Sequence, residues 1–120
     1  MYVSSDIKLV QDMVARFPSF QDLYECHIEN NGEILSHVIF WDIVQDVIKA
    51  YLEQGESVLD WQAVLDFLEG EMQIGDSGVR SVIVTSFLEA LPFPGAPGHE
   101  IVEHLGSLMS EKFHEIRPSG

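Results

Sequence analysis

The chain has 120 residues, of which 46% are hydrophobic, and its 20 acidic residues against six Lys and Arg give a formal net charge of -14. A disordered acidic tail lacks the apolar residues that offset chain entropy, so this composition predicts a folded domain with an acidic surface. The field of such a surface repels nucleic acid and anionic membranes and attracts basic proteins. We therefore expect a protein partner, with no nucleic acid and no membrane.

Length and cysteine content set further limits. The length is that of one domain, so we expect residues 1–120 to form a single acidic helical domain. The lone Cys26 cannot form an intramolecular disulfide. No stretch approaches the ~18 apolar residues of a membrane span, and residues 1–12 lack the order of charges and apolar residues of a signal peptide. These features predict a cytoplasmic protein.

The N-terminal part of the sequence predicts two helices. Ser5 is the expected N-cap of the first, whose apolar residues recur at helical spacing until Pro18, which disfavours helix at the preceding residue. The second is expected to start at Ser19, since Asp22 three residues later completes a capping-box pattern. It is expected to end at the Asn-Asn-Gly turn that finishes at Gly32.

A third helix is expected over residues 34–52, where an apolar stripe that includes Phe40 repeats at helical spacing, and Gly55 closes it. We expect this helix to be the spine of the fold. The fourth helix is predicted to open at Ser57, with Asp60 three residues later.

The C-terminal part predicts two more helices. Asp76 is the expected N-cap of a fifth helix with an apolar face over residues 79–91. Residues 91–98 read LPFPGAPG, where prolines and glycines exclude regular helix, and a last amphipathic helix is predicted over residues 101–113. The fold class is therefore all-α, as a single compact bundle of about six helices, with stacked helical hairpins as the alternative.

Patterns typical of catalytic or metal sites fail on spacing. His99 and His104 lie five residues apart, which turns them by roughly 140° around a helix, whereas a zinc-protease helix needs i and i+4. Cys26 and His27 are neighbours, so they point about 100° apart on a helix, which favours a half-buried structural cysteine over a thiolate with its base. We therefore expect no catalytic residue, no metal and no cofactor.

Acidic side chains recur at i+4 spacing, and in one pair at i+3, in the same segments. Like charges at this spacing slightly destabilise an isolated helix, so the clusters form either a solvated face or a recognition surface. The clusters are Glu25, Glu29 and Glu33; Asp42 and Asp46; and Glu53 and Glu56.

Two stretches carry a resemblance to a known family: ENNGEILSHVIFWDI, residues 29–43, and DFLEGEMQIGDSGVRSVIVTSFLEALPFPG, residues 66–95. They resemble a family of small uncharacterised bacterial helical proteins with a domain of unknown function. In that family an acidic END-G-E-LLPH stretch precedes an aromatic-Asp helix, and a SFLE-LP helix end follows a GD turn. The chain departs from this pattern at Asn31, where an acid is expected, and at Ser36, which replaces proline. The matching residues are Glu29, Asn30, Gly32, Glu33, Leu35, His37, Phe40, Asp42, Gly75, Asp76, Ser86, Phe87, Leu88, Glu89, Leu91 and Pro92.

The resemblance implies an immunity or antitoxin-like role in bacterial competition, which agrees with an acidic surface that can occupy the basic cleft of a toxin. Our leading hypothesis is a non-enzymatic immunity protein that binds and neutralises a cognate bacterial toxin. The alternative is a scaffold or regulatory subunit that binds a housekeeping protein. A third hypothesis is a small enzyme in which His37 works with Glu33 or Asp42 as acid and base.

The candidate partner-binding residues follow the acidic clusters of residues 25–53. Trp41 is the candidate anchor of the interface, although a Trp beside the Phe40 stripe also fits the core. The set consists of Glu25, Glu29, Glu33, His37, Trp41, Asp42, Asp46 and Glu53.

Overall fold

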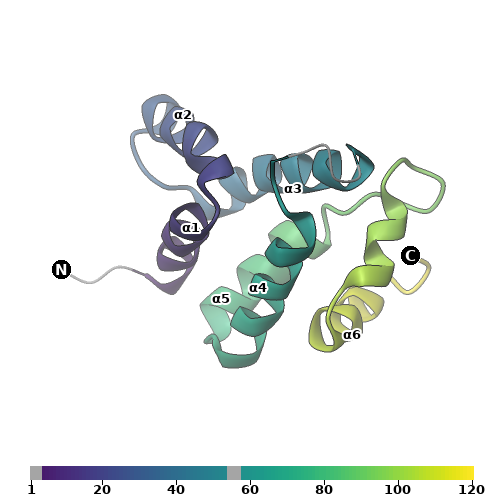
Figure 1. The fold of residues 1–120 in the computed structure, drawn as a ribbon. Coiled ribbons are helices and arrows are strands. Elements are labelled where there is room, and N and C mark those ends of the chain that lie inside the picture. The colour runs from purple at the N-terminus through teal and green to yellow at the C-terminus, as the bar shows by residue number, and fades with distance from the viewer. Residues whose placement is uncertain (1–3, 54–57) are drawn as a thin grey trace.

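A computed structural model describes residues 4–53 and 58–120, and all regular structure within them is helical (Figure 1). The all-α prediction is confirmed. The elements are α1 (Ser5–Arg16), η1 (Pro18–Phe20), α2 (Gln21–Asn31), α3 (Ser36–Glu53), α4 (Trp61–Ile74), α5 (Ser77–Val82), η2 (Ile83–Leu88), η3 (His99–His104) and α6 (Ser107–Ile116).

Helix α3 is the centre of the fold, as its apolar stripe predicted. It packs against α1, α2, α4 and η2, and Figure 1 shows it running between α2 at one end of the molecule and the C-terminal elements at the other. Its inner face is fully buried, and each such aliphatic or aromatic side chain stabilises the fold by about 1.5–3 kcal/mol. These fully buried residues are Ile39, Phe40, Ile43, Val44 and Val47.

The overall dimensions match a compact domain rather than a solenoid of stacked hairpins. The radius of gyration is 13.8 Å, close to the ~13.6 Å expected of a compact chain of this length. No helix in the described ranges combines the length and hydropathy that crossing a membrane requires.

Two predicted helix ends are confirmed, at Gly32 and at Asp76. Gly32 closes α2 in the left-handed region with φ 74°, which glycine adopts without steric cost. Asp76 caps α5 by accepting from the Val79 N–H at 3.1 Å. Asp60, expected three residues into a helix that opens at Ser57, is instead the N-cap of α4 and accepts from the Ala63 N–H at 3.1 Å. The two confirmed ends depend on residues close in sequence, so the local pattern was enough to find them.

Two predicted caps are wrong. Residues 18–20 form the short 3₁₀ turn η1 directly before α2, so Ser19 lies inside a helical turn and α2 begins without a side-chain cap. Ser5 is the first residue of α1 rather than its N-cap, and its hydroxyl instead donates to Asp76 at 2.8 Å, joining α1 to the start of α5. The predicted ends at Gly55 and Ser57 lie outside the described residues.

The fifth helix is continuous from Ser77 to Leu88, but its second half is π-helical. The Glu89 N–H donates to the Val84 carbonyl five residues earlier, at 3.2 Å. The wider turn of a π-helix shifts the side chains that follow, and such segments are frequent at functional sites. The loop after it is irregular, as predicted, with Gly95 at φ 88° and Gly98 at φ 92°.

The single helix predicted over residues 101–113 is in fact two, η3 and α6, separated by an extended residue at Leu105. The cause is a capping carboxylate from another helix. Glu69 of α4 accepts from the Leu108 N–H at 3.0 Å and from the Met109 N–H at 2.9 Å. These bonds satisfy two of the amides at the start of α6 that have no partner within the helix, so α6 begins there.

Candidate functional site

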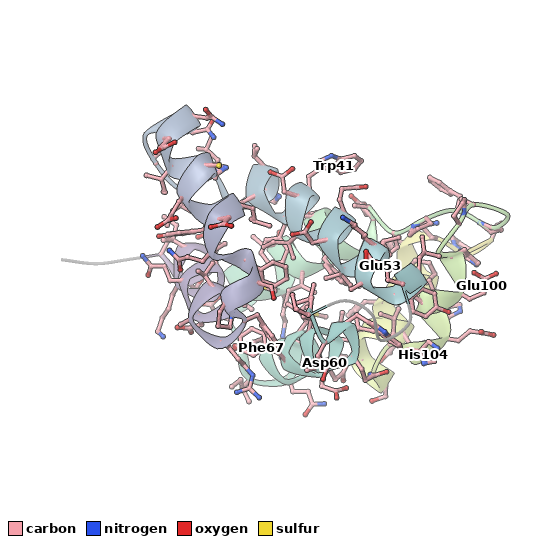
Figure 2. The ribbon with its side chains drawn as sticks, turned by 45° about the horizontal axis from the view of Figure 1, so that its top comes forward. Trp41, Glu53, Asp60, Phe67, Glu100 and His104 are labelled. Carbon is pink, nitrogen blue, oxygen red and sulfur yellow. The ribbon has the colours of Figure 1, made fainter. Side chains whose placement is uncertain are left out.

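The solvent-facing side of α3 carries three exposed apolar side chains. Val38 is 50% exposed, Trp41 57% and Leu52 50%. At 3.6 residues per turn they fall within about 60° of one another around the helix axis. Figure 2 shows the Trp41 ring standing out from α3 at the surface of the molecule. Single exposed apolar residues are ordinary, but an aligned set that includes a tryptophan is typical of a surface that binds another protein.

A hollow of about 290 Å³ lies beside Trp41, between α3 and the end of η2. The Ser86 side chain is nearly buried at 7% exposure, and its hydroxyl forms a hydrogen bond with Nδ1 of His37. This bond fixes the His37 ring against η2. We call this feature the Trp41 hollow, and its lining residues are His37, Trp41, Thr85, Ser86, Glu89 and Ala90.

The enzyme hypothesis requires Glu33 or Asp42 beside His37, and neither residue lies on the same helix face as His37. Glu33 is in the turn that follows the left-handed Gly32, before α3 begins, so it does not share a helix with His37. Asp42 is on α3 but five residues on, which turns it by about 140° from His37. The structure instead pairs His37 with Ser86.

The predicted i+4 run of glutamates is interrupted by the same turn. Glu25 and Glu29 lie on α2, where with Tyr24 and Ile28 they border a hollow of about 620 Å³. Glu33 lies beyond the end of that helix. The three carboxylates therefore do not form one helical face.

The acids of α3 lie along the helix rather than in one place. Asp42 and Asp46 are one turn apart, and the pKa of Asp46 is raised, mainly by burial and further by Asp42, against the opposing charge of Lys49. Glu53 is the last residue of α3, and Figure 2 shows it at a separate point from Trp41. The predicted binding residues thus occupy α2, the turn after it and α3. Glu25 and Glu29 share the hollow on α2, and His37 and Trp41 share the one beside η2.

Most positive charges of the chain are engaged in contacts of the fold. Five of the six Lys and Arg side chains contact a group of the same chain, and Lys49 acts on the pKa of Asp46 through its charge. Six cations compensate only a minor part of the charge of 20 acidic residues. The interactions are Lys8 with Asp12, Arg16 with the Phe17 and Phe67 rings, Lys49 with the charge of Asp46, Arg80 with the Met72 and Gln73 carbonyls, Lys112 with Glu115, and Arg117 with the carbonyls of Leu91, Pro92 and Gly120.

The groups that suggest metal or thiol chemistry are apart from one another. In residues 4–53 and 58–120, no three His, Cys, Asp or Glu side chains gather as ligands of a metal ion. Cys26 is exposed, so the expected half-buried cysteine is wrong. His27 is buried, and its Nε2 accepts from the Leu35 N–H at 2.9 Å, a bond that requires the neutral ring.

Four residues of the Trp41 hollow were not among the predicted binding residues. Thr85, Ser86, Glu89 and Ala90 come from the fifth helix and its end, and the sequence shows their helix but not its position against α3. A signal was present, since Ser86 and Glu89 belong to the SFLE stretch that carries the family resemblance. The His37–Ser86 bond joins this stretch to the other one, residues 29–43.

Comparison with known proteins supports the family but assigns no activity. Residues 10–117 match a domain of unknown function, DUF7674. No curated protein and no solved structure matches the chain. Since the match covers most of the sequence, the chain belongs to the DUF7674 family.

Proposed function

We propose that this protein is a non-enzymatic binding protein that recognises a basic protein partner through the solvent-facing side of α3. The partner that the sequence resemblance favours is a cognate bacterial toxin, which binding would neutralise. The observation that carries the proposal is the exposed line of Val38, Trp41 and Leu52 on a helix whose opposite face forms the core. Aromatic side chains in such positions are the usual anchors of protein interfaces.

Charge complementarity argues for a basic partner. The net charge of -14 gives the whole surface a negative field, because six Lys and Arg cannot compensate 20 acidic residues. Such a field speeds association with a positively charged surface and discourages neutral or acidic proteins. The basic substrate cleft of a nuclease toxin has the required chemistry.

The experiment compares two charge reversals of equal size. The protein is used to capture its partner from the source organism, and the purified partner is titrated against Asp42→Lys/Asp46→Lys on α3 and against the control Asp22→Lys/Glu111→Lys on α2 and α6. Asp22 and Glu111 are exposed. We expect the α3 variant to lose at least about tenfold more affinity than the control, because only its charges face the partner. Equal losses would show general steering without an α3 interface.

Trp41→Ala tests the apolar part of the same surface. Since the Trp41 side chain is 57% exposed, its removal should change the free energy of unfolding by less than about 0.5 kcal/mol. Partner affinity should fall by about tenfold or more if Trp41 is an anchor. A toxin whose activity is blocked by one equivalent of the protein would establish the immunity role, whereas a housekeeping partner would establish the scaffold alternative.

A further inference from the structure

We propose that the Trp41 hollow receives an arginine side chain of the basic partner, an inference that rests on the proposed function. The hollow combines one aromatic wall and one carboxylate within about 290 Å³. The aromatic wall is Trp41, which is 57% exposed. The carboxylate is Glu89, which is also exposed and follows the π-helical turn of η2.

Both groups are free to act on a ligand. In the part of the chain that the structure describes, no hydrogen bond or ion pair engages the Glu89 carboxylate. By contrast, Ser86 and His37 are bound to each other, and the Thr85 hydroxyl donates to the Ser81 carbonyl at 2.7 Å. These polar neighbours form a fixed floor, so the Trp41 ring and the Glu89 carboxylate are left to determine what binds.

The chemistry of the two groups selects a guanidinium. Its flat face stacks on an indole, and its edge donates two parallel hydrogen bonds to a carboxylate. An apolar side chain would leave the Glu89 carboxylate desolvated without a partner, which is unfavourable. An anion would meet Glu89 with no Lys or Arg among the lining residues. A lysine would satisfy the charge but lacks the planar stacking and the paired donors.

The position of the hollow agrees with this assignment. His37 and Trp41 belong to the exposed side of α3 on which Val38 also lies, so a partner that covers this side reaches the hollow. The hydrogen bond between His37 and Ser86 holds α3 and η2 together at that point. The backbones that carry Trp41 and Glu89 are therefore held together before the partner arrives, which reduces the ordering cost of binding.

The test uses Nα-acetyl-L-arginine methylamide as probe and follows the two indole N–H signals of the protein by NMR. Trp41 reports on the hollow. Trp61 is an internal control, because its ring packs against Tyr51 at 4.9 Å and His104 at 5.0 Å between centroids, in a different part of the molecule. We expect a saturable shift of the Trp41 signal, with the citrulline analogue, which is uncharged, and the lysine analogue binding at least about fivefold more weakly.

Glu89→Gln should weaken arginine binding about tenfold, since it replaces the carboxylate by an amide of the same shape. Glu111→Gln removes an equal charge from α6 and should leave binding unchanged. The inference is overturned if the Trp41 signal does not saturate, if citrulline binds as well as arginine, or if the two variants behave alike. In those cases a loss of partner affinity in Trp41→Ala would still support the proposed function, so the two failures can be told apart.

Discussion

Glu69 offers the sharpest test of how this fold is held together, because one side chain of α4 caps α6 from 39 and 40 residues away in sequence. Glu69→Ala leaves the Leu108 and Met109 amides without their acceptor. Loss of a cap costs about 1–2 kcal/mol, and loss of a negative charge at a helix N-terminus adds about 0.3–1 kcal/mol. We expect the free energy of unfolding to fall by about 2 kcal/mol, which lowers Tm by about 6–10 °C in a domain of this size.

Gly106 gives the same prediction an internal check. A Cβ at Gly106 would lie 2.4 Å from Cγ of Glu69, although the backbone there, at φ -64°, suits any residue. Gly106→Ala should therefore destabilise the protein by displacing the capping carboxylate. In the Glu69→Ala background the contact is gone. Gly106→Ala should then stabilise the protein by about 0.4–1 kcal/mol, because alanine lowers the conformational entropy of the unfolded chain. Urea unfolding of the four proteins measures the coupling. Equal effects of Gly106→Ala in both backgrounds would refute the capping argument.

The cap also predicts a dependence on pH. Burial raises the pKa of Glu69, but the hydrogen bonds from Met109, Gln73 and Leu108 together outweigh it, so the pKa is lowered. Stabilisation by this carboxylate is then complete above its unfolded pKa of about 4.3, and it is lost as the pH falls through the folded value. The difference in unfolding free energy between the native protein and Glu69→Gln should shrink in acid, whereas Glu111→Gln should show little difference at any pH. A constant difference for Glu69→Gln would contradict the reasoning.

Two further substitutions test buried polar contacts. His27→Phe should cost about 1–3 kcal/mol, because the Leu35 N–H loses the ring nitrogen that accepts from it; chemical denaturation measures this, and a change below about 0.5 kcal/mol would show that another acceptor replaces it. Arg117→Met should cost about 2–3 kcal/mol, because the buried guanidinium donates to the carbonyls of Leu91 and Pro92 and lies 4.1 Å from the centre of the Phe93 ring. Thermal unfolding measures this loss of stability, and an unchanged Tm would mean that water replaces the guanidinium as the hydrogen-bond donor to these carbonyls.

The sequence predicted those parts of the fold that depend on nearby residues. The stripe that includes Phe40 identified α3 and its buried face, because helical periodicity is a local property. The cap at Asp76 was found for the same reason, whereas the capping-box pattern before α4 pointed to Ser57 and the N-cap of that helix is Asp60. The break before α6 was missed, since a single glycine such as Gly106 disfavours a helix interior but is tolerated there, and the capping Glu69 comes from another helix. Contacts across such a distance in sequence leave no local pattern.

The candidate site was predictable only in part for a similar reason. Periodicity alone allowed Trp41 to be either core or surface, since it is next to Phe40, which is fully buried, and only packing determines where the buried stripe ends. The i+4 spacing of Glu25, Glu29 and Glu33 was counted through Gly32, although the predicted turn at Gly32 ends α2 and leaves Glu33 outside that helix. The second wall of the Trp41 hollow depends on how the fifth helix lies against α3, which no single segment specifies.

The distribution of charge separates what this protein needs for folding from what it presents to a partner. Its few cations serve the fold, as the Arg117 and Arg80 bonds to backbone carbonyls illustrate. Asp46 of α3 is placed less favourably, since burial raises its pKa and Asp42 raises it further, against the opposing charge of Lys49. A partly buried carboxylate and an exposed tryptophan are both unfavourable in the free protein, whereas a bound cationic surface would stabilise the first and cover the second. The interface proposed on α3 therefore gains free energy from both groups.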